Sequence, residues 1–454
     1  MAVLNKLIES MPREALKELQ ERRVLGTLRR VYEENKFYRQ LYDAAGINIS
    51  GIRSLEDFRR LVPMLDKRVL LADQEAFPPY GLRAWRPIQQ LHLTSGTSGV
   101  GQEVHALSEA DVISQGTPLM YQLTWAGVTP GDTVALTQPW GTTMAGPYYT
   151  EGARALGVTP LYLGAGSTEQ KIELMLRFQP AALLAIGAYI HRLSIVAESM
   201  GVVPARDLPR LRSVLSFGEP FSIEWAERME QFWNARLFDC FGATQSGGTA
   251  MAACEGGSIP AGPSGVRRRG TLHGLDHRLY LEVIEPETGD HVAPGEFGEL
   301  VVTVMSRELF PCVRFRLGDR IRYLGIGECG CGRAFTAFES GTISRYDDMI
   351  KISGFNVWTH SVDAFVLQDE RVAEYQAEVR IERLSGRERV ELTVELVPGI
   401  AGDQQQAVLS RLEDNIKSTM GISVHARLCE PMTLPRFDHK AKRWHDKRTE
   451  DLSG

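Results

Sequence analysis

Short apolar runs that alternate with helical segments between residues 131 and 243 constrain the fold more than any other feature of the sequence. The runs lack the polar residue at every second position that a half-exposed strand carries, and they are GDTVALT, VTPLYL, AALLAI, LRSVLSF and ARLFDCF. Strands of this kind are buried on both faces, and the helices between them make the crossovers of a parallel sheet. We therefore predict an α/β fold whose core is a parallel sheet covered by helices.

The pattern changes after about residue 265. Apolar and polar residues now alternate with a two-residue period in LHGLDHRLYLEVIEP, GEFGELVVTVM and FPCVRFRLGDRIRYL. This period predicts an antiparallel sheet or a small barrel. Beyond residue 347, two strand patterns, a helix over about 403–420 and a last strand predict an α+β unit. We expect a large domain over residues 1–346 and a small, mobile C-terminal lid domain over residues 347–454.

Two helices are predicted before the alternating region. Apolar residues at mostly helical spacing predict an amphipathic helix over residues 14–34. A second helix is expected from Ser108, where SEAD has the pattern of a capping box, to about Trp125.

Charge and composition exclude several classes of protein. The formal net charge of −6 argues against a general binder of nucleic acid or of anionic membranes. No apolar run approaches the roughly 20 residues that span a bilayer, and the N-terminal stretch contains acidic residues, unlike a signal peptide. Six cysteines are too sparse for a disulfide scaffold at this length. We expect a cytoplasmic protein with neither nucleic-acid nor membrane partners.

A loop of glycines and hydroxyl residues follows a predicted strand over residues 89–94. Glycine lets the backbone turn its N–H groups toward one point, so such a loop can hold phosphate oxygens. The loop lacks the lysine of a Walker A motif. The alternative is a flexible, hydroxyl-rich surface loop. The residues concerned are Thr94, Ser95, Gly96, Thr97, Ser98 and Gly99.

Five further motifs follow this loop in a fixed order: SFGEP at Ser216–Pro220, DCFGATQ at Asp239–Gln245, FRLGD at Phe315–Asp319, SRYDD at Ser344–Asp348, and DHKAKR around Lys440. Together with the loop they resemble the adenylate-forming superfamily of acyl-CoA synthetases, adenylation domains and luciferases. More narrowly, they resemble the phenylacetate–CoA ligase family. The resemblance covers essentially the whole chain.

The resemblance implies a role for each motif. The loop Thr94–Gly99 would contact the phosphates of ATP, and Thr244 the α-phosphate. Asp319 would accept hydrogen bonds from both ribose hydroxyls, which suits a carboxylate because it can accept two such bonds at once. The ATP/AMP site would also include Glu219, Phe241, which would stack on adenine, and Arg345. Without the family, Phe241 is equally well explained as core packing, and Asp319 as the cap of a turn.

Other motifs would serve a large movement of the lid. Asp347 matches the hinge position, and Gly354 and Asn356 belong to the loop that moves to the active site for thioester formation. Lys440 matches the lid lysine, whose point charge would reach between the carboxylate and the α-phosphate. The alternative for Lys440 is a basic surface tail, because further basic residues surround it.

Two glutamines depart from the family pattern. Gln102 ends a loop in which the family usually carries a lysine, and Gln245 replaces the glutamate that helps to hold Mg²⁺. An amide oxygen can still be a metal ligand, but it lacks the negative charge that attracts a hard cation. These changes are the main sequence argument against an ordinary ligase.

The resemblance also implies a structural zinc site. Some family members carry a Cys…His…Cys-x-Cys set, and Cys254, His273, Cys329 and Cys331 occupy these positions. Three thiolates and one imidazole form a closed tetrahedral set, which suits structure rather than catalysis. The alternative is a group of free buried thiols beside a hydrogen-bonded histidine.

The acyl pocket of the family would lie among Trp140, Met144, Tyr189, Phe217 and Gly218. Aromatic side chains and a methionine suit a flat ring, so we expect an aryl or arylacetic acid. The alternative is that these side chains form core between sheet and helices.

Three hypotheses on function follow. The first is an ATP-dependent aryl–CoA ligase that uses ATP, Mg²⁺ and CoA. The second is an enzyme that loads an aryl acid onto the phosphopantetheine of a carrier protein. The third is a nucleotide- or acid-binding protein that has lost turnover. A homodimer is expected from the resemblance alone.

Overall fold

The computed structural model describes residues 2–94, 102–138, 140–217, 219–262, 265–327, 329–346, 349–352, 355–381, 388–436 and 441–448. The chain divides into two units: a large one of Met1–Gly218 and Ala226–Ile343, and a small one of Glu219–Trp225 and Ser344–Gly454. Within the described residues, no helix has both the length and the apolar character needed to cross a membrane.

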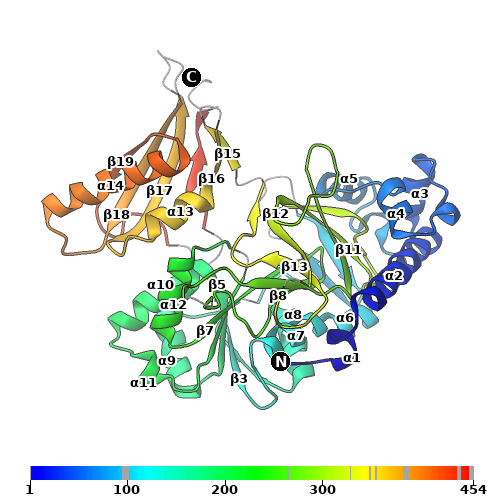
Figure 1. Ribbon diagram of the computed structural model, residues 1–454, viewed down its shortest axis with the longest axis horizontal. Helices are drawn as coiled ribbons and strands as arrows, with labels where there is room; N and C mark the ends of the chain where they lie inside the picture. Colours follow the sequence, from blue (N-terminus) through cyan, green and yellow to red (C-terminus); the bar gives the residue numbers. More distant parts are fainter. Residues whose placement is uncertain are drawn as a thin grey trace. The chain divides into compact units, whose positions relative to one another are not determined.

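One mixed sheet runs through the large unit, and its first part is parallel (Figure 1). The parallel strands lie in the order β4-β3-β5-β6-β7 and are β3 (Thr133–Leu136), β4 (Thr159–Tyr162), β5 (Ala182–Ile186), β6 (Ser213–Phe217) and β7 (Arg236–Ala243). The helices between them are α8 (Ala145–Leu156), α9 (Thr168–Phe178), α10 (Gly187–Ser199), α11 (Pro204–Asp207) and α12 (Ile223–Trp233). Because β5 and β6 are buried along almost their whole length, the prediction of a doubly covered parallel sheet is confirmed.

The antiparallel strands extend the same sheet beyond β7. Their order is β8-β9-β13-β12-β11-β10, and they are β8 (Gly248–Ala253), β9 (Thr271–Gly274), β10 (Leu279–Ile284), β11 (Phe297–Val304), β12 (Phe315–Ile326) and β13 (Thr336–Glu339). The change from parallel to antiparallel occurs between β7 and β8, which pair antiparallel. The predicted antiparallel region is therefore a continuation of the parallel sheet.

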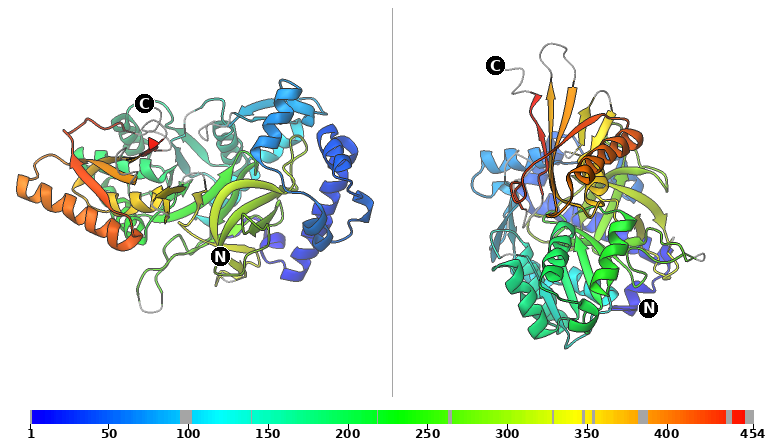
Figure 2. Two further views of the ribbon diagram at one scale, coloured as in Figure 1. Left: turned by 90° about the horizontal axis from the view of Figure 1, so that it is seen from above. Right: turned by 90° about the vertical axis from the view of Figure 1, so that its left-hand side faces the viewer.

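Helices at the N-terminus precede the sheet: α1 (Lys6–Glu9), α2 (Arg13–Glu34), α3 (Lys36–Ala44), α4 (Leu55–Leu61) and α5 (Lys67–Ala76), with single turns η1 (Ile49–Gly51) and η2 (Gly81–Arg83). Helix α2 confirms the helix predicted over residues 14–34. It buries Leu16, Val24, Leu28 and Val31 and contacts β10. Figure 1 shows α2, α3 and α4, in blue, on the side of the large unit where β11 lies, and Figure 2 shows the same blue helices together at one end of this unit.

The helix predicted from Ser108 to Trp125 is interrupted. It forms two helices, α6 (Glu109–Gln115) and α7 (Thr117–Trp125). Ser108 caps α6 in a complete capping box with Asp111, as the sequence predicts. The break falls at Gly116, where a Cβ would lie 2.4 Å from the backbone nitrogen of Gly152 in α8. Pro118, in the first turn of α7, has no N–H to continue the hydrogen bonds of α6, so the helices separate here. The close approach to α8 requires glycine at position 116.

The small unit is α+β. Its four-stranded sheet has the order β19-β18-β17-β20, formed by β17 (Val372–Ile381), β18 (Glu388–Leu396), β19 (Val424–Leu428) and β20 (Trp444–Asp446). The other elements are β14 (Ser344–Arg345), β15 (Met349–Ile352), β16 (Phe355–Trp358), α13 (Thr359–Leu367) and α14 (Gly402–Met420). Helix α14 buries Val408, Leu409, Leu412 and Ile416 in the core of this unit. The large α/β part and small α+β part agree with the predicted fold class.

Candidate active site

The predicted phosphate loop connects the two strands of a hairpin, β1 (Gln90–Leu93) and β2 (Val104–Leu107). The ends of the loop are hydrogen-bonded to each other: the Thr94 N–H donates to the Glu103 carbonyl at 3.0 Å, and the Glu103 N–H donates to Thr94 Oγ1 at 2.9 Å. Gln102 Nε2 also donates to the Thr94 carbonyl at 3.1 Å. Ser95, Gly96, Thr97, Ser98 and Gly99 lie outside the described residues.

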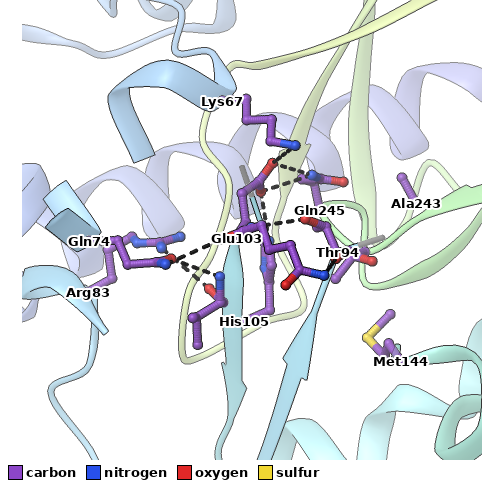
Figure 3. Close-up of polar contacts among 12 residues, drawn as sticks. Lys67, Gln74, Arg83, Thr94, Glu103, His105, Met144, Ala243 and Gln245 are labelled. Atoms are coloured by element: carbon purple, nitrogen blue, oxygen red, sulfur yellow. Dashed lines mark hydrogen bonds and ion pairs between the residues drawn. The ribbon is translucent and has the colours of Figure 1, made fainter. Parts of the chain in front are cut away.

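A buried carboxylate lies at the base of this loop. The Glu103 side chain is 0% exposed, and Figure 3 shows it between His105, Gln245 and Lys67. His105 Nε2 donates to Glu103 Oε2 at 2.8 Å, and Gln245 Nε2 lies 2.9 Å from both carboxylate oxygens. Lys67 Nζ is 4.0 Å from Oε1. Sequence reasoning missed Glu103, although an acidic residue at the start of an apolar strand was a signal for it.

The charges of this group follow from its contacts. Burial opposes ionisation of Glu103, but the hydrogen bonds from His105 and Gln245 and the nearby Lys67 charge outweigh it, so the pKa of Glu103 is lowered. His105 is completely buried, and this burial lowers its pKa to about 4 despite the neighbouring carboxylate. At neutral pH the group therefore consists of an ionised carboxylate, a neutral imidazole and a primary amide.

The turn after β7 carries Thr244 and Gln245. The buried guanidinium of Arg307 holds this turn, because its Nη1 donates to the Thr244 carbonyl at 3.1 Å. The other terminal nitrogen of Arg307 lies 3.5 Å from Met144 Sδ. Ser246 Oγ accepts from the Ala243 N–H at 2.9 Å. Arg307 thus connects the predicted α-phosphate turn to one residue of the predicted acyl pocket, and no motif pointed to it.

The predicted acyl-pocket residues differ in exposure. Met144 is buried, and Phe217 packs against Tyr149 with ring centroids 6.1 Å apart. Tyr189 is buried beneath Lys171, whose Nζ lies 4.7 Å from the ring centroid. Trp140 is 56% exposed and makes an edge contact with Tyr162. Gly218 lies outside the described residues.

The remaining nucleotide-site predictions are distributed over both units. Phe241 is buried in the main core of the large unit. Asp319 is buried on β12 beside Gly318, whose φ of 74° strains any residue with a side chain. Glu219 and Arg345 belong to the small unit. Asp347, Gly354 and Lys440 lie outside the described residues, and Asn356 lies in β16.

Four metal-ligating side chains converge in the large unit. The ligand atoms of Cys254, His273, Cys329 and Cys331 all lie within 4.8 Å of one another. Cys254 Sγ is 3.7 Å from Cys329 Sγ, and Cys331 Sγ is 3.3 Å from His273 Nε2. Zinc–sulfur bonds of about 2.3 Å in a tetrahedron put two sulfurs roughly 3.8 Å apart. The donor set and its spacing therefore fit a zinc ion.

An aromatic contact and a buried ion pair lie beside these metal-ligating side chains. The Trp125 ring meets the His273 ring edge-on, with centroids 6.2 Å apart. Arg333, two residues after Cys331, is wholly buried and pairs with Glu9 at 2.9 Å.

Comparison with known proteins identifies the class of enzyme. Residues 85–306 match the family model of the AMP-binding enzyme, and residues 354–448 match that of the AMP-binding enzyme C-terminal domain. A phenylacetate-coenzyme A ligase of Thermus thermophilus is 30% identical over 95% of this chain and 96% of its own length. One of Pseudomonas putida is 29% identical over 97% and 96%.

A solved structure shows the same fold. The crystal structure of 2-hydroxyisobutyryl-CoA ligase in the postadenylation state matches with a TM-score of 0.87 at 24% identity, covering 100% of this chain and 94% of the other. The chain therefore belongs to the adenylate-forming AMP-binding enzyme family, in its phenylacetate–coenzyme A ligase-like branch, and is an AMP-forming acid–thiol ligase. The resemblance stated from the motifs is confirmed.

Proposed function

We propose that this chain activates an aromatic carboxylic acid with ATP and transfers the acyl group to the thiol of CoA. In the first step a carboxylate oxygen bonds to the α-phosphorus, and the bond to the leaving pyrophosphate breaks. In the second step the thiol sulfur bonds to the acyl carbon, and AMP leaves. The observation that carries the proposal is the nearly full-length match to phenylacetate–CoA ligases.

The roles of the side chains are part of the proposal. Negative charge grows on the phosphate oxygens in the first step, so catalysis depends on positioning and on fixed donors. We assign these donors to the Thr94–Gly99 loop, Thr244 and Lys440. A Mg²⁺ bound with ATP would neutralise phosphate charge, and the Gln245 carboxamide offers it an oxygen of the type that Mg²⁺ prefers.

The domain division also belongs to the proposal. We place the hinge at Asp347, between a large domain of residues 1–346 and a lid of residues 347–454, and the thiol-step loop at Gly354 and Asn356. Rotation of the lid would withdraw Lys440 and admit the thiol. An aromatic acid is supported by the ring-rich surroundings of Phe217, where Tyr149 packs at 6.1 Å.

Pyrophosphate release tests the first step. ATP, Mg²⁺ and a panel of benzoates, anthranilates, phenylacetates and aliphatic acids are supplied, with and without CoA. We expect release with at least one aromatic acid, and AMP and acyl-CoA when CoA is added. Release with aliphatic acids alone would reject the aromatic pocket. Turnover that requires a carrier protein instead of CoA would favour the loading enzyme, and no release with any acid would favour the binding protein.

A matched pair of lysines tests the lid assignment. Lys440→Ala is expected to slow pyrophosphate release by about 100-fold, since it removes charge stabilisation at the transferring phosphorus. Lys442→Ala removes an exposed lysine two residues away and is expected to change the rate by less than about twofold. Equal effects of the two substitutions would contradict the assignment.

We propose further that Cys254, His273, Cys329 and Cys331 hold one structural zinc ion. The convergence of their ligand atoms within 4.8 Å supports this. Elemental analysis of protein purified without chelator should give about one zinc per chain, because a closed four-ligand site binds the ion tightly. Cys331→Ser should lose the zinc, whereas Cys429→Ser, which removes a free cysteine of the small unit, should retain it. Less than about a tenth of a zinc per chain would refute the site.

A homodimer is a separate expectation that light scattering tests.

A further inference from the structure

The Glu103–Gln245 pair explains why position 245 requires an amide in this chain. An ionised carboxylate offers only acceptors, and both oxygens of Glu103 lie 2.9 Å from Gln245 Nε2. A carboxylate at position 245 would place oxygens against oxygens at this distance, inside a group whose Glu103 side chain is 0% exposed. Burying two like charges in contact is strongly unfavourable.

The same contact determines which way the amide faces. Because Nε2 is directed at Glu103, Oε1 lies on the other side of the amide carbon, as Figure 3 shows. Gln245 as a residue is only half-buried, whereas the Glu103 side chain is 0% exposed. A donor nitrogen held by a carboxylate also polarises the amide and increases the negative charge on its oxygen.

The pair lies at the predicted nucleotide site. The Glu103 N–H donates to Thr94 Oγ1 at the start of the phosphate loop, and Gln245 follows Thr244 directly. Two cations face the Glu103 charge: Lys67, whose Nζ is 4.0 Å away and whose side chain is 23% exposed to water, and the buried guanidinium of Arg83.

We propose that Glu103 is a positioning residue for metal-bound nucleotide: it orients the Gln245 carboxamide with its oxygen toward the nucleotide and supplies the negative charge that Gln245 lacks. This inference rests on the proposed function for the location of the nucleotide. The two residues together therefore do what a single carboxylate at position 245 would do in the family pattern.

A charge exchange tests the pair. ATP affinity is measured by calorimetry in excess Mg²⁺ and in EDTA for the wild type, Glu103→Gln, Gln245→Glu and the double variant Glu103→Gln/Gln245→Glu. The readout is the factor by which Mg²⁺ tightens ATP binding. Gln40→Glu, at an exposed position of α3, is the control for a bare change from glutamine to glutamate and should match the wild type.

The expected pattern separates electrostatics from folding. Glu103→Gln should reduce the Mg²⁺ factor by about tenfold, the usual effect of losing a partner of a metal ligand. It should not weaken ATP binding in EDTA, because it removes a charge that repels the free phosphates. A merely structural role would weaken both measurements together, and that result would overturn the proposal.

The exchanged pair gives the decisive comparison. Gln245→Glu should lose the Mg²⁺ factor or the fold, because it creates the like-charged contact. The double variant restores a donor opposite an acceptor and should recover the factor to within about threefold of the wild type, since each single change alone costs more. A double variant no better than either single variant would overturn the proposal, as would a Gln245→Glu protein equal to the wild type.

These outcomes are distinguishable from failure of the proposed function. If the wild type binds ATP with Mg²⁺ but releases no pyrophosphate with any acid, the ligase function fails while the affinity pattern still tests Glu103. If acyl-CoA forms but all four proteins show the same Mg²⁺ factor, the function stands and the role of Glu103 is wrong.

Discussion

Glu9→Gln should destabilise the large unit, because Glu9 forms a buried ion pair that connects the N-terminal segment to Arg333, which precedes β13. Its side chain and that of Arg333 are both 0% exposed, and Arg333 Nε donates to Glu9 Oε2 at 2.9 Å. Trp125 Nε1 donates to the same oxygen at 2.8 Å. The backbone N–H groups of Leu4 and Asn5 donate to Oε1 at 2.7 and 2.9 Å.

The size of the effect follows from what the substitution leaves behind. Breaking a buried ion pair by removing one charge costs about 3–5 kcal/mol. Arg333 keeps a second carboxylate, Glu255, at 2.7 Å, and that partner is 31% exposed. The amide of glutamine also turns a donor toward either Trp125 and Arg333 or the two backbone N–H groups. We therefore expect a loss of about 3 kcal/mol, or a fall in Tm of about 4–6 °C for a unit of this size.

Thermal and urea unfolding of the whole chain measure this loss. The control is Glu18→Gln, a substitution at an exposed position of α2, which should change stability by less than about 0.5 kcal/mol. If Glu9→Gln and Glu18→Gln shift the transition equally, the ion pair contributes nothing net and our account of how the N-terminus is anchored is wrong.

Three further predictions address pH, packing and the small unit. Burial, with Arg278 and Arg23 nearby, lowers the pKa of His277 to about 3. The unfolded chain takes up a proton on this histidine near pH 6.5 and the folded chain does not, so the free energy of unfolding decreases as the pH falls below 6.5, by about 2 kcal/mol at pH 5. His277→Gln should remove this part of the pH dependence, and an unchanged pH profile would refute the prediction. Gly116→Ala should lower the free energy of unfolding by about 2–3 kcal/mol, because the new Cβ would lie 2.4 Å from the backbone of Gly152. Gly26→Ala, in α2 with nothing within 4 Å of the new Cβ, should raise it by up to about 1 kcal/mol. If both substitutions change the free energy of urea unfolding in the same direction, the close contact between Gly116 and Gly152 is contradicted. Arg443→Met should destabilise the small unit by about 3 kcal/mol, because it leaves Glu374, which Arg443 contacts at 2.6 Å, buried without that partner. Arg389→Met, at an exposed position of β18, is the control, and an equal effect of the two substitutions would argue against this role of Arg443.

Local patterns predicted the strands and most helices because each depends on residues close in sequence. The continuous apolar runs became β3 to β7, and Ser108 caps α6 as its motif indicates. The break at Gly116 has a local signal in Pro118, which the prediction of one continuous helix overlooked. The need for glycine at position 116 could not be predicted in the same way, because it depends on Gly152, which reaches it only through the packing of α8.

The site residues show the same difference between what local sequence predicts and what only the fold reveals. The order of the motifs indicated the family, and it also indicated the Cys and His positions that converge within 4.8 Å. Glu103 and Gln245 are 142 residues apart, and only the fold reveals that they pair. The departure at Gln245 was visible in the sequence, but its explanation lies in a buried carboxylate that no local pattern assigns to position 245. Arg333 and Glu9 are 324 residues apart and illustrate the same limit.

The most direct test of the central claim is the identity and ratio of the reaction products. The chain is incubated with ATP, Mg²⁺, CoA and each acid of the aromatic panel, and nucleotides and thioesters are separated by chromatography and identified by mass spectrometry. We expect AMP and aryl-CoA in equal amounts with at least one aromatic acid, and enzyme-bound acyl-AMP when CoA is omitted. ADP as the nucleotide product, or no thioester with any aromatic acid, would contradict it.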